Sequence, residues 1–251
     1  MNTQQQKLFK VLLIGDSCTD KYVYGSVKRL NPEAPVPILD YKRTETRQGM
    51  AWNVFNNLKS FGLKVYMLTN KEKIVKTRYI DEKTNQQILR VDEEVEVQPM
   101  SYELPDEIYD AVVISDYDKG FVSNQKLFEI VYKVNCPVFI DTKKTVFPTH
   151  NCYVKINDLE YSKLNQNYDN LIITRGSKGA EYDGILYPGE KVNVYDVVGA
   201  GDTFLAALTF GYLKYSRIED AIPFANKAAA IAVSNSGTYV LTEEDVENLC
   251  N

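Results

Sequence analysis

Short apolar runs of strand type recur along the chain, and they limit its possible folds more than any other feature. They occupy residues 11–14, 65–68, 111–114, 138–140 and 171–173. Each run is too short for a helix, and most of them end in a small or acidic residue. Because the runs are apolar on both faces, they are typical of parallel strands buried inside a sheet.

Helical patterns lie between several of these runs. We expect helices over residues 51–60, 124–133, 203–214 and 218–234, the last of which is rich in alanine. Alternating strands and helices predict an α/β fold with a mainly parallel central sheet, in which ligands bind at the carboxyl ends of the strands. No Pro-, Gly- or Ser-rich linker interrupts the sequence, so we expect one domain over residues 1–251.

Two segments depart from this alternation. Residues 22–41 contain three prolines and then alternate apolar and polar side chains, and residues 76–97 alternate in the same way. Such alternation predicts antiparallel strands with one solvated face. We therefore expect a small antiparallel β flap, or lid, formed from about residues 18–45 and 76–97. Its exposed edge would invite pairing with a second copy, so a homodimer through the flap is also expected.

Composition excludes several classes of protein. The net charge of −5 argues against a general nucleic-acid or anionic-membrane binder, and no apolar run approaches the roughly 18 residues of a membrane span. The four cysteines form no C-x-x-C pair and His150 is the only histidine, so neither a disulfide frame nor a Cys/His metal site is expected. The N-terminus lacks the apolar stretch of a secretory signal, and together these features predict a cytoplasmic protein.

The sharpest local pattern is DVVGAGDTF at residues 196–204, a glycine turn that leads into an apolar helix. Small residues let the backbone approach a ligand, and the helix start offers free amides and a positive dipole end for a phosphoryl group. The carboxylate of Asp202 would repel a bound anion, so its place in this turn is explained if it accepts the proton of a sugar hydroxyl whose oxygen attacks a γ-phosphate. The alternative is that Asp202 only caps the helix. A Walker A loop, a G-x-G-x-x-G fingerprint and a G-x-S-x-G elbow are all absent from the sequence.

This turn resembles that of the ribokinase-like (PfkB-type) carbohydrate kinases, and further segments resemble the same family in the same order. They are GDSCTDKY (15–22), NPEAPVP (31–37), QQILRVD (86–92), SDYDKG (115–120), DTK (141–143), NDLE (157–160), TRGSKG (174–179) and FANKAAA (224–230). The NPEAPVP segment resembles most specifically the kinases of D-glycero-β-D-manno-heptose 7-phosphate. The resemblance implies a ribokinase-like three-layer sandwich and phosphoryl transfer from ATP, with Mg²⁺, to a sugar hydroxyl.

The resemblance also implies a role for individual residues. The implied roles are catalytic base for Asp202, anion binding for the backbone of Gly199, Ala200 and Gly201, sugar binding for Asp16, Asp20, Gly49 and Asn53, nucleotide binding for Thr174, Gly176, Gly179, Asn226 and Lys143, and Mg²⁺ binding, mostly through water, for Asn157 and Glu160. Some family members hold a monovalent cation near the positions of Asp196 and Val198. Alternatives stay open. Asn157 and Glu160 fit a helix cap, Asp16 fits a strand-end turn, and Lys143 could form an ion pair with Asp141 instead of binding the nucleotide.

A phosphorylated sugar needs cations for its far phosphate. Lys76, Arg78 and Arg90 lie in the expected flap, where strand alternation places them on one face. These cations are candidates for sugar-phosphate binding, and the alternative is a solvated strand edge protected by charge.

Some positions depart from the family pattern. The segment Gly49-Met-Ala-Trp-Asn53 lacks the second of two adjacent glycines and adds bulk at Met50 and Trp52, which either reshape the sugar pocket or turn into the core. The chain is also short after Thr69 and after Glu160. We expect an ATP-dependent kinase that converts the heptose 7-phosphate to its 1,7-bisphosphate for ADP-heptose and surface polysaccharide formation. A PfkB-type kinase for another sugar and a catalytically silent sugar- or nucleotide-binding relative are the alternatives.

Overall fold

The computed structural model describes residues 8–101, 103–235 and 237–251, which form one large sheet, one small sheet and the helices around them. The large sheet has eight strands in the order β12-β11-β10-β9-β8-β7-β1-β4. Strands β4, β1, β7, β8, β9 and β10 run parallel, and β11 and β12 continue the sheet antiparallel. The bounds are β1 Lys10–Gly15, β4 Lys64–Thr69, β7 Ala111–Asp116, β8 Val138–Thr142, β9 Cys152–Asn157, β10 Leu171–Thr174, β11 Gly179–Tyr182 and β12 Ile185–Pro188. The mainly parallel α/β sheet predicted from the sequence is confirmed.

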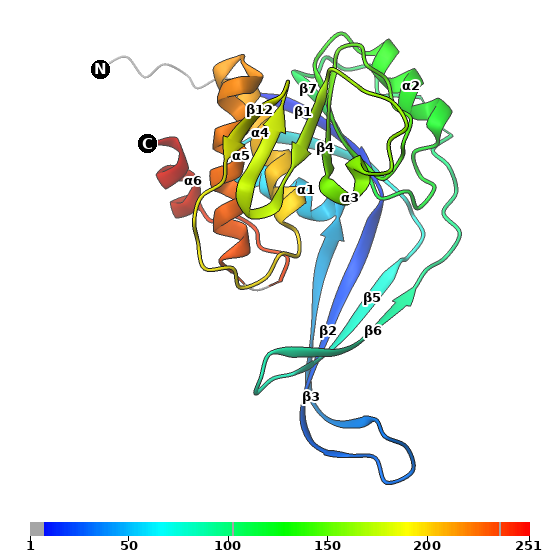
Figure 1. The fold of residues 1–251 in the computed structure, drawn as a ribbon. Coiled ribbons are helices and arrows are strands. Elements are labelled where there is room, and N and C mark those ends of the chain that lie inside the picture. The colour runs from blue at the N-terminus through cyan, green and yellow to red at the C-terminus, as the bar shows by residue number, and fades with distance from the viewer. Residues whose placement is uncertain (1–7, 102, 236) are drawn as a thin grey trace.

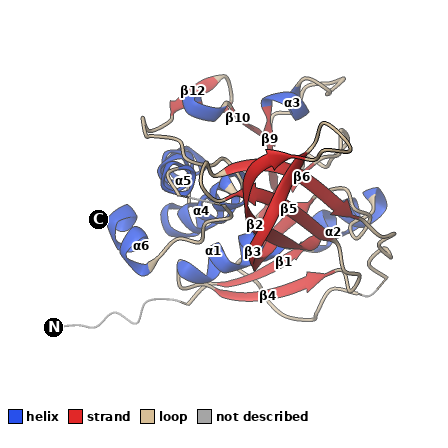
Figure 2. Ribbon diagram, turned by 90° about the horizontal axis from the view of Figure 1, so that it is seen from below, coloured by secondary structure: helices blue, strands red, loops and turns tan. Residues whose placement is uncertain are grey.

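Helices cover both faces of the large sheet, which makes three layers (Figures 1 and 2). One face carries α1 (Ala51–Ser60), α4 (Ala200–Tyr215), α5 (Ile218–Val233) and α6 (Glu243–Cys250), and the other carries α2 (Asn124–Lys133). A short helix, α3 (Asp158–Tyr161), follows β9, and a 3-10 turn, η1 (Gly176–Lys178), precedes β11. Within the described residues, none of these helices is both long and apolar enough to cross a membrane.

The core is divided by the sheet into two apolar clusters. Along β1, Val11 and Leu13 belong to the cluster under α1, α4 and α5, whereas Leu12 and Ile14 belong to the cluster under α2. All four side chains are fully buried. This alternation explains why the strand reads as a continuous apolar run, because both of its faces are covered by helices.

The small sheet forms the flap, which extends away from the main body (Figure 1). Its strands are β2 (Ser17–Leu30), β3 (Pro37–Met50), β5 (Val75–Asp81) and β6 (Gln86–Glu93), in the order β3-β2-β5-β6. The predicted flap is confirmed as a separate small sheet, in which β2–β3 and β5–β6 pair antiparallel, while the central pair β2–β5 is parallel. Both of these strands lead outward from the large sheet, after β1 and β4, whereas β3 and β6 are the return strands of two hairpins.

Candidate active site

The glycine turn forms the N-terminus of α4. Gly199 is the residue before the helix and has a φ of 81°, in the left-handed region that favours glycine. A Cβ at this position would also lie 2.7 Å from Nδ2 of Asn53 and 3.3 Å from Cα of Thr238. The turn therefore packs closely against α1 and against the segment after α5, and its amides begin a 16-residue helix whose dipole favours a bound anion.

Asp202 lies in the first turn of α4 and is only 3% exposed. One carboxylate oxygen, Oδ2, accepts a hydrogen bond from Nδ2 of Asn53 at 3.1 Å, and the other, Oδ1, accepts one from the Tyr117 hydroxyl at 2.7 Å. Burial raises the pKa of Asp202 to about 6, against the two hydrogen bonds, which lower it. Because α4 has no side-chain cap and begins after Gly199, Asp202 is not the residue that caps this helix. The carboxyl group is suited to accept a proton near neutral pH.

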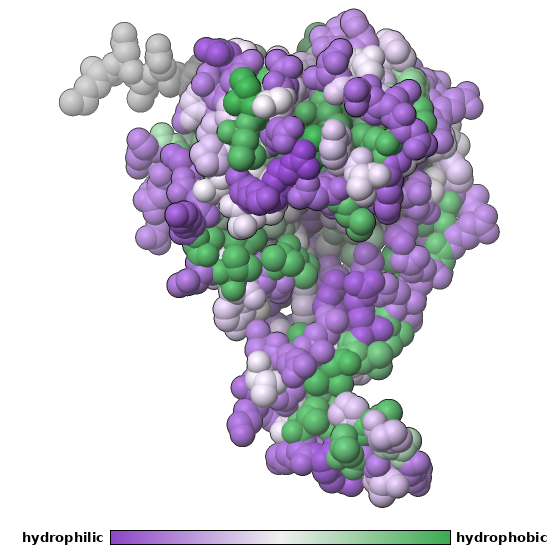
Figure 3. All heavy atoms as spheres, in the orientation of Figure 1, coloured by the Kyte–Doolittle hydropathy of each residue, from purple (hydrophilic) through white to green (hydrophobic). Residues whose placement is uncertain are grey.

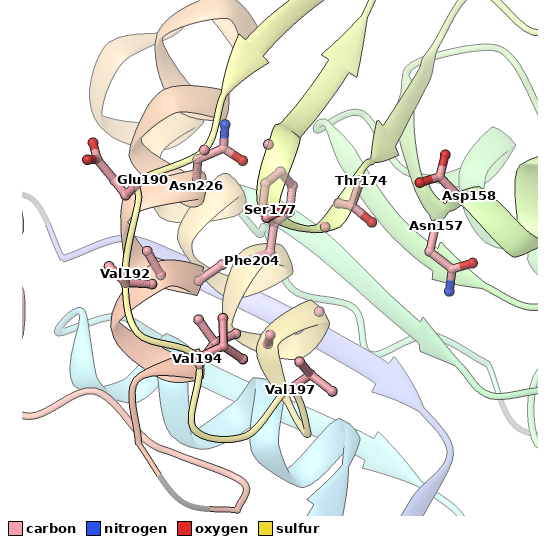
Figure 4. A pocket seen from close by; sticks show the side chains of 18 of the residues that line it. Asn157, Asp158, Thr174, Ser177, Glu190, Val192, Val194, Val197, Phe204 and Asn226 are labelled. Carbon is pink, nitrogen blue, oxygen red and sulfur yellow. The ribbon is translucent and has the colours of Figure 1, made fainter.

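A pocket of about 710 Å³ opens beside the glycine turn (Figure 4). Ala200 and Gly201 form one wall of it, next to Phe204 of the same helix. Four of the five residues predicted to bind the nucleotide, Thr174, Gly176, Gly179 and Asn226, line this pocket, and so does Asn157. The fifth, Lys143, is not among the lining residues and pairs with Glu160 instead. The structure thus brings together in one cavity residues that are widely separated along the chain.

The far part of the pocket is largely apolar. Val192, Val194 and Val197 come from the loop between β12 and α4, and Figure 4 shows their side chains beside Phe204. The amide of Asn226 donates hydrogen bonds to the carbonyls of Tyr187 and Pro188, at 2.9 and 3.2 Å, and so holds β12 against α5. An apolar slot with a few polar groups is typical of sites for a flat ring carrying polar substituents.

The opposite side of Asp202 faces the flap. Asp20 of β2 and Arg78 of β5 form an ion pair in which both side chains are largely buried. Gly49 of β3 lies opposite Cys18, and a Cβ at position 49 would overlap the carboxylate of Asp20. Lys76 places its ammonium 5.7 Å from the centre of the Tyr117 ring, whose hydroxyl bonds Asp202. This side therefore carries paired charges rather than an apolar cavity.

Comparison with known proteins agrees with this geometry. A model of the pfkB family of carbohydrate kinases matches residues 156–245, which include the last two residues of β9, most of the residues that line the pocket and the glycine turn. "Bifunctional protein HldE" of a Nitratiruptor species is 31% identical over 95% of this chain and 64% of that protein's own length. Residues 156–245 thus resemble the pfkB family of carbohydrate kinases, and the chain spans less than two thirds of that relative.

Solved structures share the fold of this chain. A mutant form of Escherichia coli phosphofructokinase-2 matches with a TM-score of 0.73 at 16% identity, over 97% of this chain and 98% of its own. The Arabidopsis thaliana ribokinase complexed with ribose and ATP matches with a TM-score of 0.71 at 16% identity, over 97% of this chain and 99% of its own. The ribokinase-like fold predicted from the sequence is confirmed.

The predicted magnesium residues form a capping box on α3. The Asn157 side chain accepts a hydrogen bond from the Glu160 amide at 2.9 Å, and Oε2 of Glu160 accepts one from the Asn157 amide at 2.8 Å. The other oxygen of Glu160 pairs with Lys143. Among residues 8–101, 103–235 and 237–251, no group of three His, Cys, Asp or Glu side chains could hold a metal ion. The helix-cap alternative thus describes this pair, and these donors do not form a metal site by themselves.

Asp16 and the three cations of the flap lie in different surroundings. Asp16 is fully buried, and its carboxylate accepts hydrogen bonds from the backbone amides of residues 117, 119 and 121, so the geometry favours the strand-end turn over a sugar contact.

The register of β5 and β6 places Arg78 opposite Arg90, with Lys76 on the same face, as alternation predicts. However, Arg90 is 49% exposed and bonds Asp92 of its own strand, so for Arg90 the structure favours the solvated edge.

The bulky residues that depart from the family pattern turn into packing. Met50 is buried in the cluster under α2, although its φ of 57° is one that glycine adopts more easily. The Trp52 ring packs edge-on against Phe55 of the same helix, at 5.2 Å between ring centres.

Asp196, near the implied cation position, accepts hydrogen bonds from the amides of Val198 and Gly237, which join the turn to the segment after α5.

Sequence reasoning missed one functional candidate, Lys155 on β9. This lysine is 5% exposed, lines the pocket and pairs with Asp141, with Nζ 2.6 Å from Oδ2. A Cβ on Gly201 would lie only 2.9 Å from Nζ, so the ammonium group sits against the glycine turn. A buried cation at an anion-binding turn is suited to hold phosphate. The available signal was its place two residues before Asn157 in the NDLE segment.

Proposed function

We propose that this chain is an ATP-dependent kinase that phosphorylates a sugar hydroxyl. The observation that carries the proposal is the buried carboxylate of Asp202 at a glycine turn, between a nucleotide-sized pocket and the charged face of the flap. Phosphoryl transfer needs a proton acceptor on one side of the reacting phosphate and bound nucleotide on the other. The position of the Asp202 carboxylate between the pocket and the flap supports the proposal.

The chemistry follows from the positions of the groups. Asp202 accepts the proton of the acceptor hydroxyl while that oxygen bonds to the γ-phosphorus of ATP, and the bond from the γ-phosphorus to the ADP oxygen breaks. The backbone amides of Gly199, Ala200 and Gly201 and the α4 dipole stabilise the charge on the transferring group. Lys155, held by Asp141, adds a positive charge beside the same turn.

For the acceptor we propose D-glycero-β-D-manno-heptose 7-phosphate, phosphorylated at its anomeric hydroxyl to the 1,7-bisphosphate that leads to ADP-heptose. The support is the 31% identity to the HldE protein and the cations Lys76 and Arg78 on the inner side of the flap. We propose that Asp20 and Asn53 bind acceptor hydroxyls. The support is that Asp20 is on the flap strand β2 and that Asn53 contacts Asp202.

A substrate panel tests the proposal. The purified chain is incubated with ATP, Mg²⁺ and phosphorylated heptoses and hexoses, and products are identified by mass. We expect one added phosphoryl group on the heptose 7-phosphate, and a much slower formation of this product with Asp202→Asn. If only a hexose phosphate is phosphorylated, the proposed acceptor is wrong but the proposed kinase activity stands. If no substrate is phosphorylated although ATP still binds, a catalytically silent binding protein is favoured.

We also propose that the flap joins two copies of the chain. Apolar side chains gather on it (Figure 3), and Leu30, Val36, Leu89 and Val91 are exposed there. Paired exposed strands and apolar residues favour self-association. Gel filtration of the wild type at micromolar concentration should give a dimer, and Leu89→Lys with Val91→Lys should give a monomer. A wild-type monomer at that concentration contradicts this proposal.

A further inference from the structure

Tyr117 makes a contact that the proposed reaction does not yet explain. It follows β7 directly, and its hydroxyl donates a hydrogen bond to Oδ1 of Asp202 at 2.7 Å. The ring lies near two ammonium groups, with Lys76 of the flap at 5.7 Å and Lys143 at 5.5 Å from its centre. The side chain thus reaches the base from the acceptor side of the site.

The backbone fixes where this side chain stands. The Tyr117 amide donates a hydrogen bond to Oδ2 of the buried Asp16 at 2.8 Å, and the Lys119 amide donates to the same oxygen at 3.1 Å. The Phe121 amide donates to the other oxygen at 3.2 Å. Three bonds to one fully buried carboxylate hold the backbone of the loop from which the Tyr117 side chain reaches Asp202.

We propose that Tyr117 is a positioning residue that orients Asp202 and stabilises its ionised form, so that the carboxylate can act as a base near neutral pH. The role in turnover rests on the proposed kinase function, whereas the effect on the carboxylate does not. A hydrogen bond donated to an ionised oxygen is stronger than one donated to a neutral carboxylic acid. The bond therefore favours the state of Asp202 that can accept a proton.

Electrostatics of the surroundings make this contribution necessary. Burial raises the pKa of Asp202, Asp141 raises it further, and the hydrogen bonds from Tyr117 and Asn53 together with Lys155 lower it. Burial and the neighbouring carboxylates raise the pKa of Tyr117 well above its usual value, so the phenol stays protonated and remains a donor. The charged or titratable groups facing the pair are Asp141 on β8, Lys143 after β8, Lys155 on β9, Cys18 on β2 and Lys76 on β5.

The direct test is the titration of Asp202 in Tyr117→Phe, a variant that keeps the ring beside the two lysines. Aspartate carboxyl carbons are labelled with ¹³C, and the Asp202 resonance is assigned by its loss in Asp202→Asn. We expect the midpoint in Tyr117→Phe to lie about one pH unit above that of the wild type, because the ionised form loses a donor. An unchanged or lower midpoint overturns the proposal.

A matched control removes a hydroxyl of the same kind elsewhere. The Tyr109 hydroxyl is buried and has no hydrogen-bond partner among the described residues, so Tyr109→Phe should leave the Asp202 midpoint within about 0.2 units. A shift of equal size in both variants would mean a general effect of the substitution and would overturn the proposal.

Kinetics then connect the titration to turnover. In Tyr117→Phe the acid limb of kcat/KM should move up by the same increment, so that the rate at pH 6 falls about three- to tenfold while KM for ATP stays unchanged. A wild type without turnover would contradict the kinase function, yet the titration would still decide the role of Tyr117. A merely structural role would lower the rate equally at every pH and would overturn the proposal.

Discussion

The two sides of Asp202 are built in different ways. On the nucleotide side, a cavity of about 710 Å³ is already open and is walled by valines, alanines and the glycine turn. On the acceptor side, the polar groups already bind one another, as Asp20 does with Arg78 and as Tyr117 and Asn53 do with Asp202. A ligand can enter the first side without breaking contacts, but on the second it must exchange bonds with groups that are paired. Selectivity is therefore expected to reside on the acceptor side.

The strongest test of this comparison is Asp202→Asn, at the boundary of the two sides. We expect kcat to fall by about 10²- to 10⁴-fold, because an amide cannot take the proton, while the affinity for ATP changes little. Initial rates and a calorimetric titration with ATP measure the two effects. Asp81→Asn, which changes a buried aspartate in the flap that bonds Thr84, serves as control and should retain activity. Weakened ATP binding in Asp202→Asn would show that the two sides are not separable.

On the acceptor side, Arg78→Ala should raise KM for the sugar phosphate about 10- to 100-fold and leave KM for ATP nearly unchanged. The reason is that Arg78 is buried and faces Asp20, so its removal also leaves that carboxylate without its partner. Arg90→Ala is the matched control, because this guanidinium is half exposed and bonds Asp92. Equal KM values for the sugar phosphate in the two variants would remove Arg78 from the acceptor site.

The shared base predicts a pH dependence. Because the pKa of Asp202 is raised to about 6, the ionised fraction and therefore kcat/KM should fall about tenfold between pH 7 and pH 5. Stability should change in the opposite direction, since a carboxyl group with a raised pKa in the folded state favours folding most at low pH. Its contribution is lost as pH rises from the ordinary value of 3.8 through about 6. Thermal melts of the wild type and Asp202→Asn across this range measure it, and parallel curves would contradict it.

The smallest effect is expected on the nucleotide side. Val194→Ala removes methyl groups from the pocket wall and should raise KM for ATP about threefold, without altering KM for the sugar phosphate. Val194 is already 60% exposed, so folding should be unaffected. Val146→Ala, an exposed valine outside the pocket, is the control. A larger change in the sugar KM than in the ATP KM would reverse the assignment of the two sides.

Strand and helix positions were largely predictable because their patterns are local. The helices expected at residues 51–60 and 124–133 have those bounds in the structure, since each is an uninterrupted amphipathic segment. Strand β9 was not predicted, because the buried Lys155 interrupts its apolar residues. The burial of this lysine is compensated by its ion pair with Asp141. The parallel pairing of β2 with β5 was also hidden, because strand direction depends on which element each strand leaves.

Site residues divide in the same manner. The glycine turn and the pocket residues Thr174, Gly176 and Gly179 could be inferred because their chemistry is carried by backbone and spacing. The contacts of Asp16 and Tyr117 could not, because the first depends on three amides of a distant loop and the second on a bond across 85 positions. Long-range pairing of polar side chains leaves no periodic trace in a sequence.

The absence of a side chain at position 49 has a consequence for how this site can change. Since even a methyl group there would displace the carboxylate of Asp20, alanine is as unsuitable as any larger residue. Its neighbour Met50 shows that the next position tolerates a long side chain directed into the core. Adaptation to a new acceptor would thus proceed most easily at other positions of the flap strands, because a side chain at position 49 requires the Asp20 carboxylate to move.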